Sequence, residues 1–368
     1  MEIEELHSIF MKDDVSQSII GQENVKRQVK SALVSGRHMI IVGPPGIGKT
    51  TLAKDIARLL PEKEIDRDIS SMISADSLVG KQVKEKSTRV SSKKSSGTPK
   101  KAKVSGMGRF VRVQGSPDLT VEDLMGDIDP VKAMKYGPLS LEAFTPGKIF
   151  KANDGILFFD EVNRCSEKLQ NALLQVLEEG KVTIGGYEVD FDVDFLFIGT
   201  MNPKDFSTEN LSDVFLDRFD LVYMDYPESL KDEKDIVMAY GKRLIDMKKK
   251  KNVKIFNIIV SYTRSLRNSQ KLERFPSVRA TIGVYERAQA NALIDGRTTM
   301  NIKDFKEAIT SVLSHRIKLK PSVKYMQSPA EVLEDEFNAY AKANNIDMDD
   351  LSDGGDDITP EPDSGDDG

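Results

Sequence analysis

"IVGPPGIGKT", residues 41 to 50, is the stretch that decides the fold. It fits the pattern G-x-x-x-x-G-K-[ST], in which glycines let backbone N–H groups bend around phosphates without an obstructing Cβ. The apolar run "HMIIV" before it predicts a buried strand, and "TLAKDIARLL" after it has helical spacing, with Pro61 as a stop. Strand, glycine-rich loop and helix is the order that a phosphate-binding loop requires, because the helix N-terminus faces the anion. The stretch therefore predicts phosphate binding.

The loop also supplies the charges that a nucleotide needs. We expect Lys49 to contact the β and γ phosphate oxygens, and Thr50 to offer its hydroxyl to Mg²⁺. The residues expected to bind the nucleotide are Gly43, Pro44, Pro45, Gly46, Ile47, Gly48, Lys49, Thr50 and Thr51.

A second motif, "ILFFDE", places two carboxylates at the end of an apolar strand. In a parallel sheet this is the edge at which the ligand lies. We expect Asp160 to hold Mg²⁺, and Glu161 to orient and deprotonate the attacking water. An ordinary acidic strand end is the alternative interpretation, and the phosphate loop about 110 residues upstream argues against it. The second acid favours hydrolysis over binding alone.

Strands and helices alternate through the first part of the chain. Further apolar runs begin at Phe110, end at Asp160 and Thr200, and begin again at Asp220, with helical patterns between them. Strands that are apolar on both faces and alternate with helices predict a parallel sheet in an α/β layer fold.

After Pro227 the strand signals stop, and helical spacing with a capping pair at Asn301 and Asp304 predicts a small all-helical domain. A pair of alternating runs around Gly185 predicts a β-hairpin within the first domain. The expected organisation is an N-terminal extension 1–16, an α/β domain 17–226, a helical domain 227–325, a C-terminal helix 326–345 and an acidic tail 346–368.

The net charge of −6 conceals two oppositely charged segments. Residues 81–112 carry eleven Lys or Arg against one acid, and residues 346–368 carry ten acids and no base. Both the tail and the Ser- and Lys-rich insertion 81–108 have too few apolar residues to order themselves. The insertion could bind nucleic acid or an acidic partner by charge, or be a solvated surface loop.

Composition excludes several classes of protein. One cysteine, Cys165, rules out an internal disulfide framework and a cysteine-cluster zinc site. No apolar run is long enough to cross a membrane, and the acidic start does not read as a secretory signal. We therefore expect a cytoplasmic protein with no membrane partner.

Five stretches occur in an order that is more specific than any one motif. They are the phosphate loop, "LFFDEVNRCSEKLQNALLQVLEEGKVTIGG", "FLFIGTMNP", "LDRFDL" and "PSVRATIG". Together, from Ile20 to about Arg316, they resemble an AAA+ ATPase of the magnesium chelatase I-subunit and MoxR-like branch. The resemblance implies a P-loop NTPase domain with a five-stranded parallel sheet flanked by helices, followed by a small all-helical lid domain. It also implies an insertion at about 130–146 and the hairpin around Gly185.

The resemblance assigns roles to four further residues. Asn202 in "GTMNP" resembles the sensor that helps position the attacking water, with a turn-forming Asn before Pro203 as the alternative. Arg218 in "LDRFD" resembles an arginine finger that acts on a neighbouring subunit, with a surface ion pair to Asp217 or Asp220 as the alternative. Arg279 in "SVRA" resembles the second sensor, in cis or in trans, and Gln22 lies where contacts with the nucleotide base begin.

The resemblance implies Mg²⁺-dependent ATP hydrolysis in a homo-oligomeric ring, expected to be a hexamer, with ATP and Mg²⁺ as cofactors. Its partner would be a protein with a von Willebrand A domain, and its task the remodelling of that partner, metal insertion or complex maturation. Two alternatives stay open. A nucleic-acid motor predicts an ATPase that DNA stimulates, and a nucleotide-gated scaffold with negligible turnover predicts that Glu161→Gln changes nothing.

Overall fold

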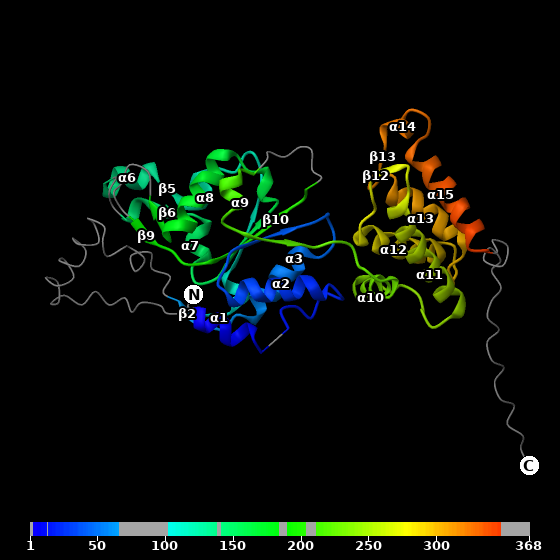
Figure 1. Ribbon diagram of the computed structural model, residues 1–368, viewed down its shortest axis with the longest axis horizontal. Helices are drawn as coiled ribbons and strands as arrows, with labels where there is room; N and C mark the ends of the chain where they lie inside the picture. The colour runs from blue at the N-terminus through cyan, green and yellow to red at the C-terminus, as the bar shows by residue number, and fades with distance from the viewer. Residues whose placement is uncertain are drawn as a thin grey trace, which may run out of the picture. The chain divides into compact units, whose positions relative to one another are not determined.

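The computed structural model describes most of the chain as two compact units, Met1–Asp225 and Tyr226–Gly368 (Figure 1). The described residues are 3–12, 14–65, 102–137, 141–183, 190–203 and 211–346.

The first unit is built on a five-stranded sheet in which all neighbouring strands are parallel. Its strands are β1 (Met39–Val42), β4 (Phe110–Gln114), β7 (Ile156–Asp160), β10 (Leu196–Met201) and β11 (Asp220–Tyr223). Their order in the sheet is β11-β1-β10-β7-β4. The predicted parallel sheet is thus confirmed, with all five predicted strands in it.

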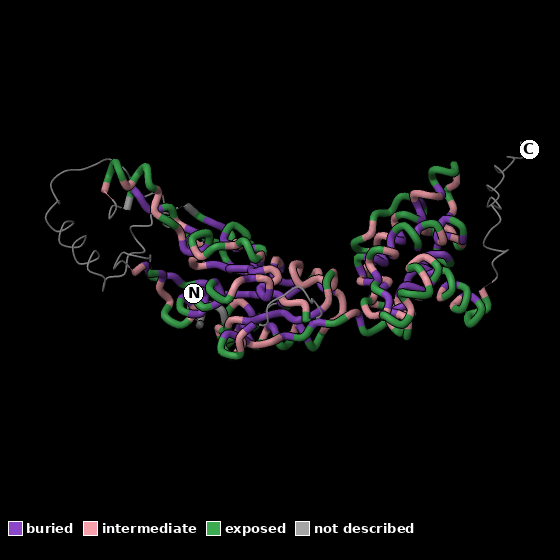
Figure 2. The backbone as a smooth tube through the Cα atoms, turned by 90° about the horizontal axis from the view of Figure 1, so that it is seen from above, coloured by how far each residue is buried: buried purple, intermediate pink, exposed green. Residues whose placement is uncertain are grey.

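Helices cover both faces of this sheet, as the apolar strands require (Figure 1). Successive strand residues point to opposite faces, so Ile41 packs under one helical layer and Ile40 under the other. The first layer consists of α1 (Ile3–Phe10), α2 (Glu23–Val34) and α3 (Lys49–Leu59). The second consists of α5 (Val121–Met125), α7 (Lys148–Ala152), α8 (Glu167–Glu179) and α9 (Asp213–Leu216). Figure 2 shows the buried residues running along the strands between these layers.

A buried carboxylate fixes α3, the helix that follows the phosphate loop. Asp55 accepts hydrogen bonds from the hydroxyls of Ser16 and Ser18 and from the Ser18 N–H. Burial alone would raise the pKa of Asp55, but the hydrogen bonds from Ser16 and Ser18, with that from Arg58, outweigh it and lower the pKa. The segment that precedes α2 is therefore tied to α3.

Two antiparallel ribbons of the first unit add side chains to the core beneath the second helical layer. One pairs β5 (Gly126–Ile128) with β6 (Phe144–Pro146), and between them lies α6 (Pro130–Tyr136), a helix without a buried residue. The other pairs β8 (Lys181–Thr183) with β9 (Asp190–Asp192), which confirms the predicted hairpin strands, while its turn at Gly185 lies outside the described residues.

The prediction that residues 81–108 lack order is wrong for their last seven residues. Ala102–Val104 forms β3, which pairs with β2 (Lys63–Ile65), and a 3₁₀ turn follows at Gly106–Arg109. Composition does not reveal that this short segment packs closely against α3. Val104 is buried, and a Cβ at Gly106 would lie 2.0 Å from the Ala57 carbonyl oxygen. Residues 81–101 and the tail 347–368 lie outside the described residues.

The second unit is helical, as predicted, around one buried apolar core. Its helices are α10 (Leu230–Tyr240), α11 (Lys250–Ser265), α12 (Val278–Ile294), α13 (Ile302–Leu313), α14 (Pro321–Lys324) and α15 (Pro329–Ala343). The capping pair of Asn301 and Asp304 begins α13. A short ribbon of β12 (Leu272–Arg274) and β13 (Lys318–Leu319) was not predicted. Among the described helices of both units, none is long and apolar enough to span a bilayer.

Candidate active site

The phosphate loop joins β1 directly to α3 and contains two glycines in the left-handed region, Gly46 (φ 74°) and Gly48 (φ 107°). Gly43 is constrained for another reason, because a Cβ there would lie 2.0 Å from the Met224 carbonyl oxygen. The first N–H groups of α3 have no acceptor within the helix and carry the positive end of its dipole. Such a loop fits a chain of phosphates.

Lys49 is the first residue of α3, and its ammonium turns back over the loop. Its Nζ donates hydrogen bonds to the carbonyl oxygens of Gly43 and Pro44 at 2.6 and 2.9 Å. Thr50 and Thr51 follow in the first turn of the helix. The loop therefore presents a cation and a hydroxyl beside its own N–H groups, a donor set that suits Mg²⁺-bound phosphates.

Asp160 ends β7 two strands away from β1, at the same carboxyl edge of the sheet. Its Oδ1 accepts a hydrogen bond from the Thr200 hydroxyl at 2.7 Å, and its Oδ2 pairs with Arg112 Nη2 at 2.6 Å. Thr200 is fully buried in β10, the strand between β1 and β7. A carboxylate oriented in this way is a suitable ligand for Mg²⁺ beside Thr50.

Glu161 adopts the left-handed conformation (φ 58°), which turns the chain sharply at the end of β7. The Thr200 hydroxyl oxygen accepts the Glu161 N–H at 2.9 Å, so one side chain holds both members of the acidic pair. The Glu161 carboxylate accepts a hydrogen bond from Gln114 Nε2 at 3.0 Å and pairs with Arg164 Nη1 at 3.2 Å.

Asn202 follows the last residue of β10 and lies at this same edge. The Gly43 N–H donates to the carbonyl oxygen of the preceding Met201 at 3.0 Å, which joins β10 to the start of the phosphate loop. Asn163, which is buried, donates its Nδ2 hydrogen to the Asn202 carbonyl oxygen at 3.4 Å. The fold thus brings together the loop, Asp160, Glu161 and Asn202, all of them chosen from the sequence.

Arg218 is not part of this cluster, and Arg279 belongs to the second unit. Arg218 lies before β11 begins at Asp220, and it pairs with Glu178 of α8, whereas Asp220 pairs with Arg37. The alternative ion pair of Arg218 with Asp217 or Asp220 is therefore replaced by one with Glu178. Arg279 lies in the first turn of α12 in the second unit and is exposed.

Four residues that contact the acidic pair were not predicted from the sequence: Thr200, Arg112, Gln114 and Arg164. Thr200 could have been found, since it stands in "GTMNP" at the end of a strand next to the "ILFFDE" strand. Arg112 and Gln114 belong to β4, and only the register of β4 against β7 places Gln114 opposite Asp160.

Comparisons with known proteins agree with this arrangement. Residues 14–108 match the family described as magnesium chelatase, subunit ChlI. Residues 93–221 match the ATPase family associated with various cellular activities (AAA), and residues 267–336 match the AAA lid domain.

Relatives cover nearly the whole chain. The magnesium-chelatase subunit ChlI homolog of Methanocaldococcus jannaschii is 30% identical over 357 residues, which are 90% of this chain and 92% of that protein. Chaperone MoxR1 of Mycobacterium tuberculosis is 25% identical over 334 residues, which are 83% of this chain and 74% of that protein. Among solved structures, the RuvB Holliday junction branch migration motor of Thermotoga maritima superposes with a TM-score of 0.46 at 16% identity, covering 93% of this chain and 88% of that one. The chain belongs to the AAA+ ATPases, in the branch of magnesium chelatase ChlI subunits and MoxR-like proteins.

Proposed function

We propose that this AAA+ protein hydrolyses ATP with Mg²⁺ in a ring of identical copies and uses the energy to remodel a partner protein. In this proposal Lys49 and the N–H groups of the loop bind the β and γ phosphates, and Thr50 and Asp160 hold the metal. Bound Mg²⁺ would neutralise charge on the phosphoryl oxygens as the terminal phosphate leaves. All these groups lie at the carboxyl edge of the parallel sheet, where ligands bind in such folds, and this supports the assignment.

Glu161 is the proposed general base. Its carboxylate would take a proton from a water molecule while the water oxygen attacks the γ phosphorus, and ADP would leave with the bridging oxygen. Asn202 would orient that water through its side-chain amide. Thr200 supports both roles, because its hydroxyl fixes the backbone of Glu161 and the carboxylate of Asp160.

The observation that carries the ring proposal is the position of Arg218. It precedes β11, and the first residue of β11, Asp220, is paired with Met39 at the start of β1. The phosphate loop begins at the other end of β1, roughly 10 Å along the strand. A guanidinium at the opposite edge is suited to the site of a neighbouring copy, where it would stabilise charge on the γ phosphate.

An exposed apolar surface on α6 supports a protein client. Val131 and Met134 are 76% and 90% exposed, and Tyr136 is 50% exposed with the Lys135 ammonium over its ring. Val131 and Met134 lie three residues apart and so share one side of the helix. We propose that this insertion contacts the client when a subunit rotates. Relatives are named as a magnesium-chelatase subunit homolog and as a chaperone, which favours a client that needs metal insertion or maturation. We propose a protein with a von Willebrand A domain as that client.

The test uses Glu161→Gln, which should bind ATP and fail to cleave it. Purified with ATP and Mg²⁺, this variant should run as a ring-sized assembly and retain its client, whereas Lys49→Ala should do neither. Wild-type turnover equal to that of Glu161→Gln would instead indicate a scaffold. Stimulation of the wild-type ATPase by DNA, with no protein client recovered, would indicate a nucleic-acid motor.

A further inference from the structure

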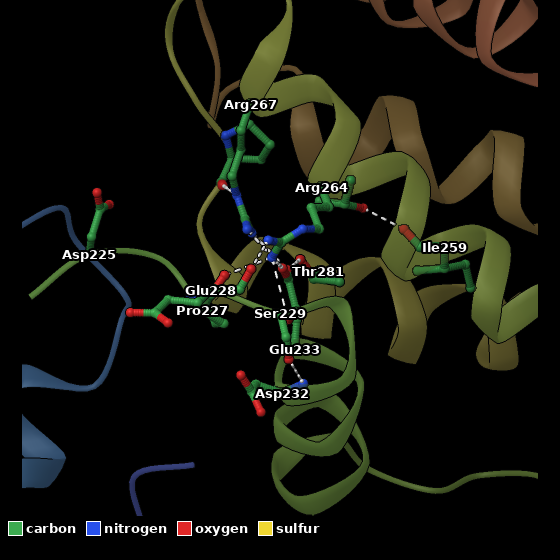
Figure 3. A network of polar contacts seen from close by, with 12 residues as sticks. Asp225, Pro227, Glu228, Ser229, Asp232, Glu233, Ile259, Arg264, Arg267 and Thr281 are labelled. Atoms are coloured by element: carbon green, nitrogen blue, oxygen red, sulfur yellow. Dashed lines mark hydrogen bonds and ion pairs between the residues drawn. The ribbon is translucent and has the colours of Figure 1, made fainter. Parts of the chain in front are cut away.

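Glu233 is a fully buried carboxylate in the second unit, and Figure 3 shows three side chains converging on it. Arg267 binds it with two parallel hydrogen bonds, from Nη1 and Nη2 to the two carboxylate oxygens at 2.7 Å each. The Thr281 hydroxyl donates to it at 2.9 Å, and Arg264 Nη1 lies 3.4 Å away. One charged group of α10 is thus joined to α11, to the turn after α11, and to α12.

The same arginines bind the segment at which the second unit begins. Arg264 Nη1 donates to the Pro227 carbonyl oxygen at 2.7 Å, and its Nη2 donates to the Glu228 carbonyl oxygen. The Arg267 guanidinium lies over the Tyr226 ring, 4.3 Å from its centroid. Residues 226–228 are therefore bound to the helices of the second unit by two cations that share one buried anion.

At its other side the cluster fixes the start of α12. Arg267 Nε donates to the Pro276 carbonyl oxygen at 3.1 Å, just before the helix, and Thr281 binds Glu233 from within its first turns. Arg279 lies between these two anchor points. The backbone around Arg279 is therefore held by side chains that bind Glu233, and so is the segment 226–228, which we call the entry segment.

Arg279 itself is not held by a polar contact among the described residues, and its side chain is exposed. A cation in the first turn of a helix also faces the positive end of the helix dipole, which disfavours it. Its environment therefore leaves the side chain available for an anion.

The last residue of the first unit is held separately. Gln22 Nε2 donates to the Asp225 carbonyl oxygen at 2.7 Å. The chain is thus bound at Asp225 within the first unit and at residues 226–228 within the second.

We infer that Glu233, acting through Arg264 and Arg267, is a positioning residue that holds the entry segment 226–228 and the first turn of α12, which carries Arg279, in one fixed arrangement. A rotation of the entry segment then moves Arg279 by the same rotation. A buried ionic cluster is a poor way to gain stability compared with apolar packing, whereas it fixes geometry through directional bonds. This inference rests on the proposed function in one respect, the action of Arg279 on the nucleotide.

The test is a double-variant cycle on the full-length assembly, with Arg264→Lys, Arg279→Ala and both together. Lysine keeps the charge and loses the fork that spans two carbonyl groups. We expect Arg264→Lys to lower kcat about tenfold with little change in KM, and to have no further effect when Arg279 is already alanine. The matched control is Arg287→Lys. Arg287 is exposed and lies in α12, the helix of Arg279, and its replacement should leave kcat unchanged.

Thr281 offers a gentler variant in case Arg264→Lys does not fold. Thr281→Val removes only the hydroxyl that binds Glu233 and should lower kcat severalfold, whereas Thr281→Ser keeps the hydroxyl and should restore it. The inference is overturned if Arg264→Lys and Thr281→Val leave kcat unchanged, or if their effects are equally large without Arg279. An Arg279→Ala variant of normal kcat refutes the role of Arg279 and the inference with it. If Arg279→Ala lowers kcat but Arg264→Lys and Thr281→Val do not, the inference is refuted while the role of Arg279 stands.

Discussion

Lys49 and Arg218 lie at opposite edges of one parallel sheet. Lys49 follows the carboxyl end of β1, and Arg218 precedes the amino end of the neighbouring strand β11. Each copy of the chain therefore carries Lys49 at the carboxyl edge of its sheet and Arg218 at the amino edge. Such a polarity is what a head-to-tail contact between identical copies requires, and head-to-tail contacts form a ring when the rotation between copies closes.

Replacing Arg218 by alanine should lower the ATPase rate by at least ~10³-fold, since a guanidinium acting on the γ phosphate contributes about that much. Its ion pair with Glu178 provides the control. The Arg218 and Glu178 side chains are 48% and 43% exposed, so the pair adds little stability. Glu178→Gln should leave the rate within about twofold of wild type. Equal losses in Arg218→Ala and Glu178→Gln, measured by steady-state phosphate release, would assign Arg218 a structural role.

Thr200→Val should weaken Mg²⁺ binding, because the Thr200 hydroxyl contacts both acidic residues. Without the hydroxyl, the Asp160 carboxylate loses its 2.7 Å donor and the Glu161 N–H loses its acceptor. Loss of a group that orients a metal ligand typically costs about 10- to 100-fold in metal affinity. Titration of Mg²⁺ in the ATPase assay should show this shift for Thr200→Val and not for Thr200→Ser. An unchanged Mg²⁺ dependence of the valine variant would contradict the bridging role.

Phe337→Ala should destabilise the second unit by about 3–5 kcal/mol, the usual loss for a buried phenylalanine. The ring is 1% exposed and packs edge-on against Tyr262 and Phe305, with centroids 5.4 Å from each. Tyr325→Ala, at a site that is 91% exposed, is the control and should change stability by less than about 0.5 kcal/mol. Differential scanning calorimetry should show one transition of Phe337→Ala shifted to lower temperature. A single uniform shift of all transitions would mean that the two units do not unfold separately.

His38 should make the first unit less stable below neutral pH. Burial, with a smaller contribution from the neighbouring Arg37 charge, lowers the pKa of His38 from 6.5 to about 4. Its Nδ1 accepts the Phe197 N–H at 3.1 Å, which requires the neutral ring. Since the pKa is lower in the folded state, the unfolded chain binds more protons between these values. The stabilisation is complete above pH 6.5 and is lost as the pH falls towards 4.

The size of this effect can be measured by urea unfolding at pH 7.5 and pH 5. The wild-type free energy of unfolding should fall by about 1–3 kcal/mol more than that of His38→Gln, which cannot titrate. If the free energy of unfolding falls equally in both proteins between pH 7.5 and pH 5, His38 does not cause the loss of stability.

The sequence predicted those parts of the site that depend on local pattern. Glycines at 43, 46 and 48, the "ILFFDE" strand end and the "GTMNP" strand end each follow from short-range chemistry, and parallel pairing brings them to one edge. Gln114 was missed because its role depends on the register between β4 and β7, which sets it opposite Asp160. The order of residues 102–108 was missed because it depends on Gly106 fitting against the end of α3. The Glu233 cluster was missed because its members lie up to 48 residues apart along the chain.

Mixing two inactive variants tests the shared active site most directly. Lys49→Ala lacks the proposed phosphate-binding cation and keeps Arg218, while Arg218→Ala lacks the proposed arginine finger and keeps the loop. If each ATP is cleaved between copies, an equal mixture that exchanges subunits should regain about a quarter of the wild-type ATPase rate, because one interface in four joins an intact loop to an intact arginine. A mixture as inactive as either variant alone, although subunit exchange is demonstrated, would contradict hydrolysis between neighbouring copies.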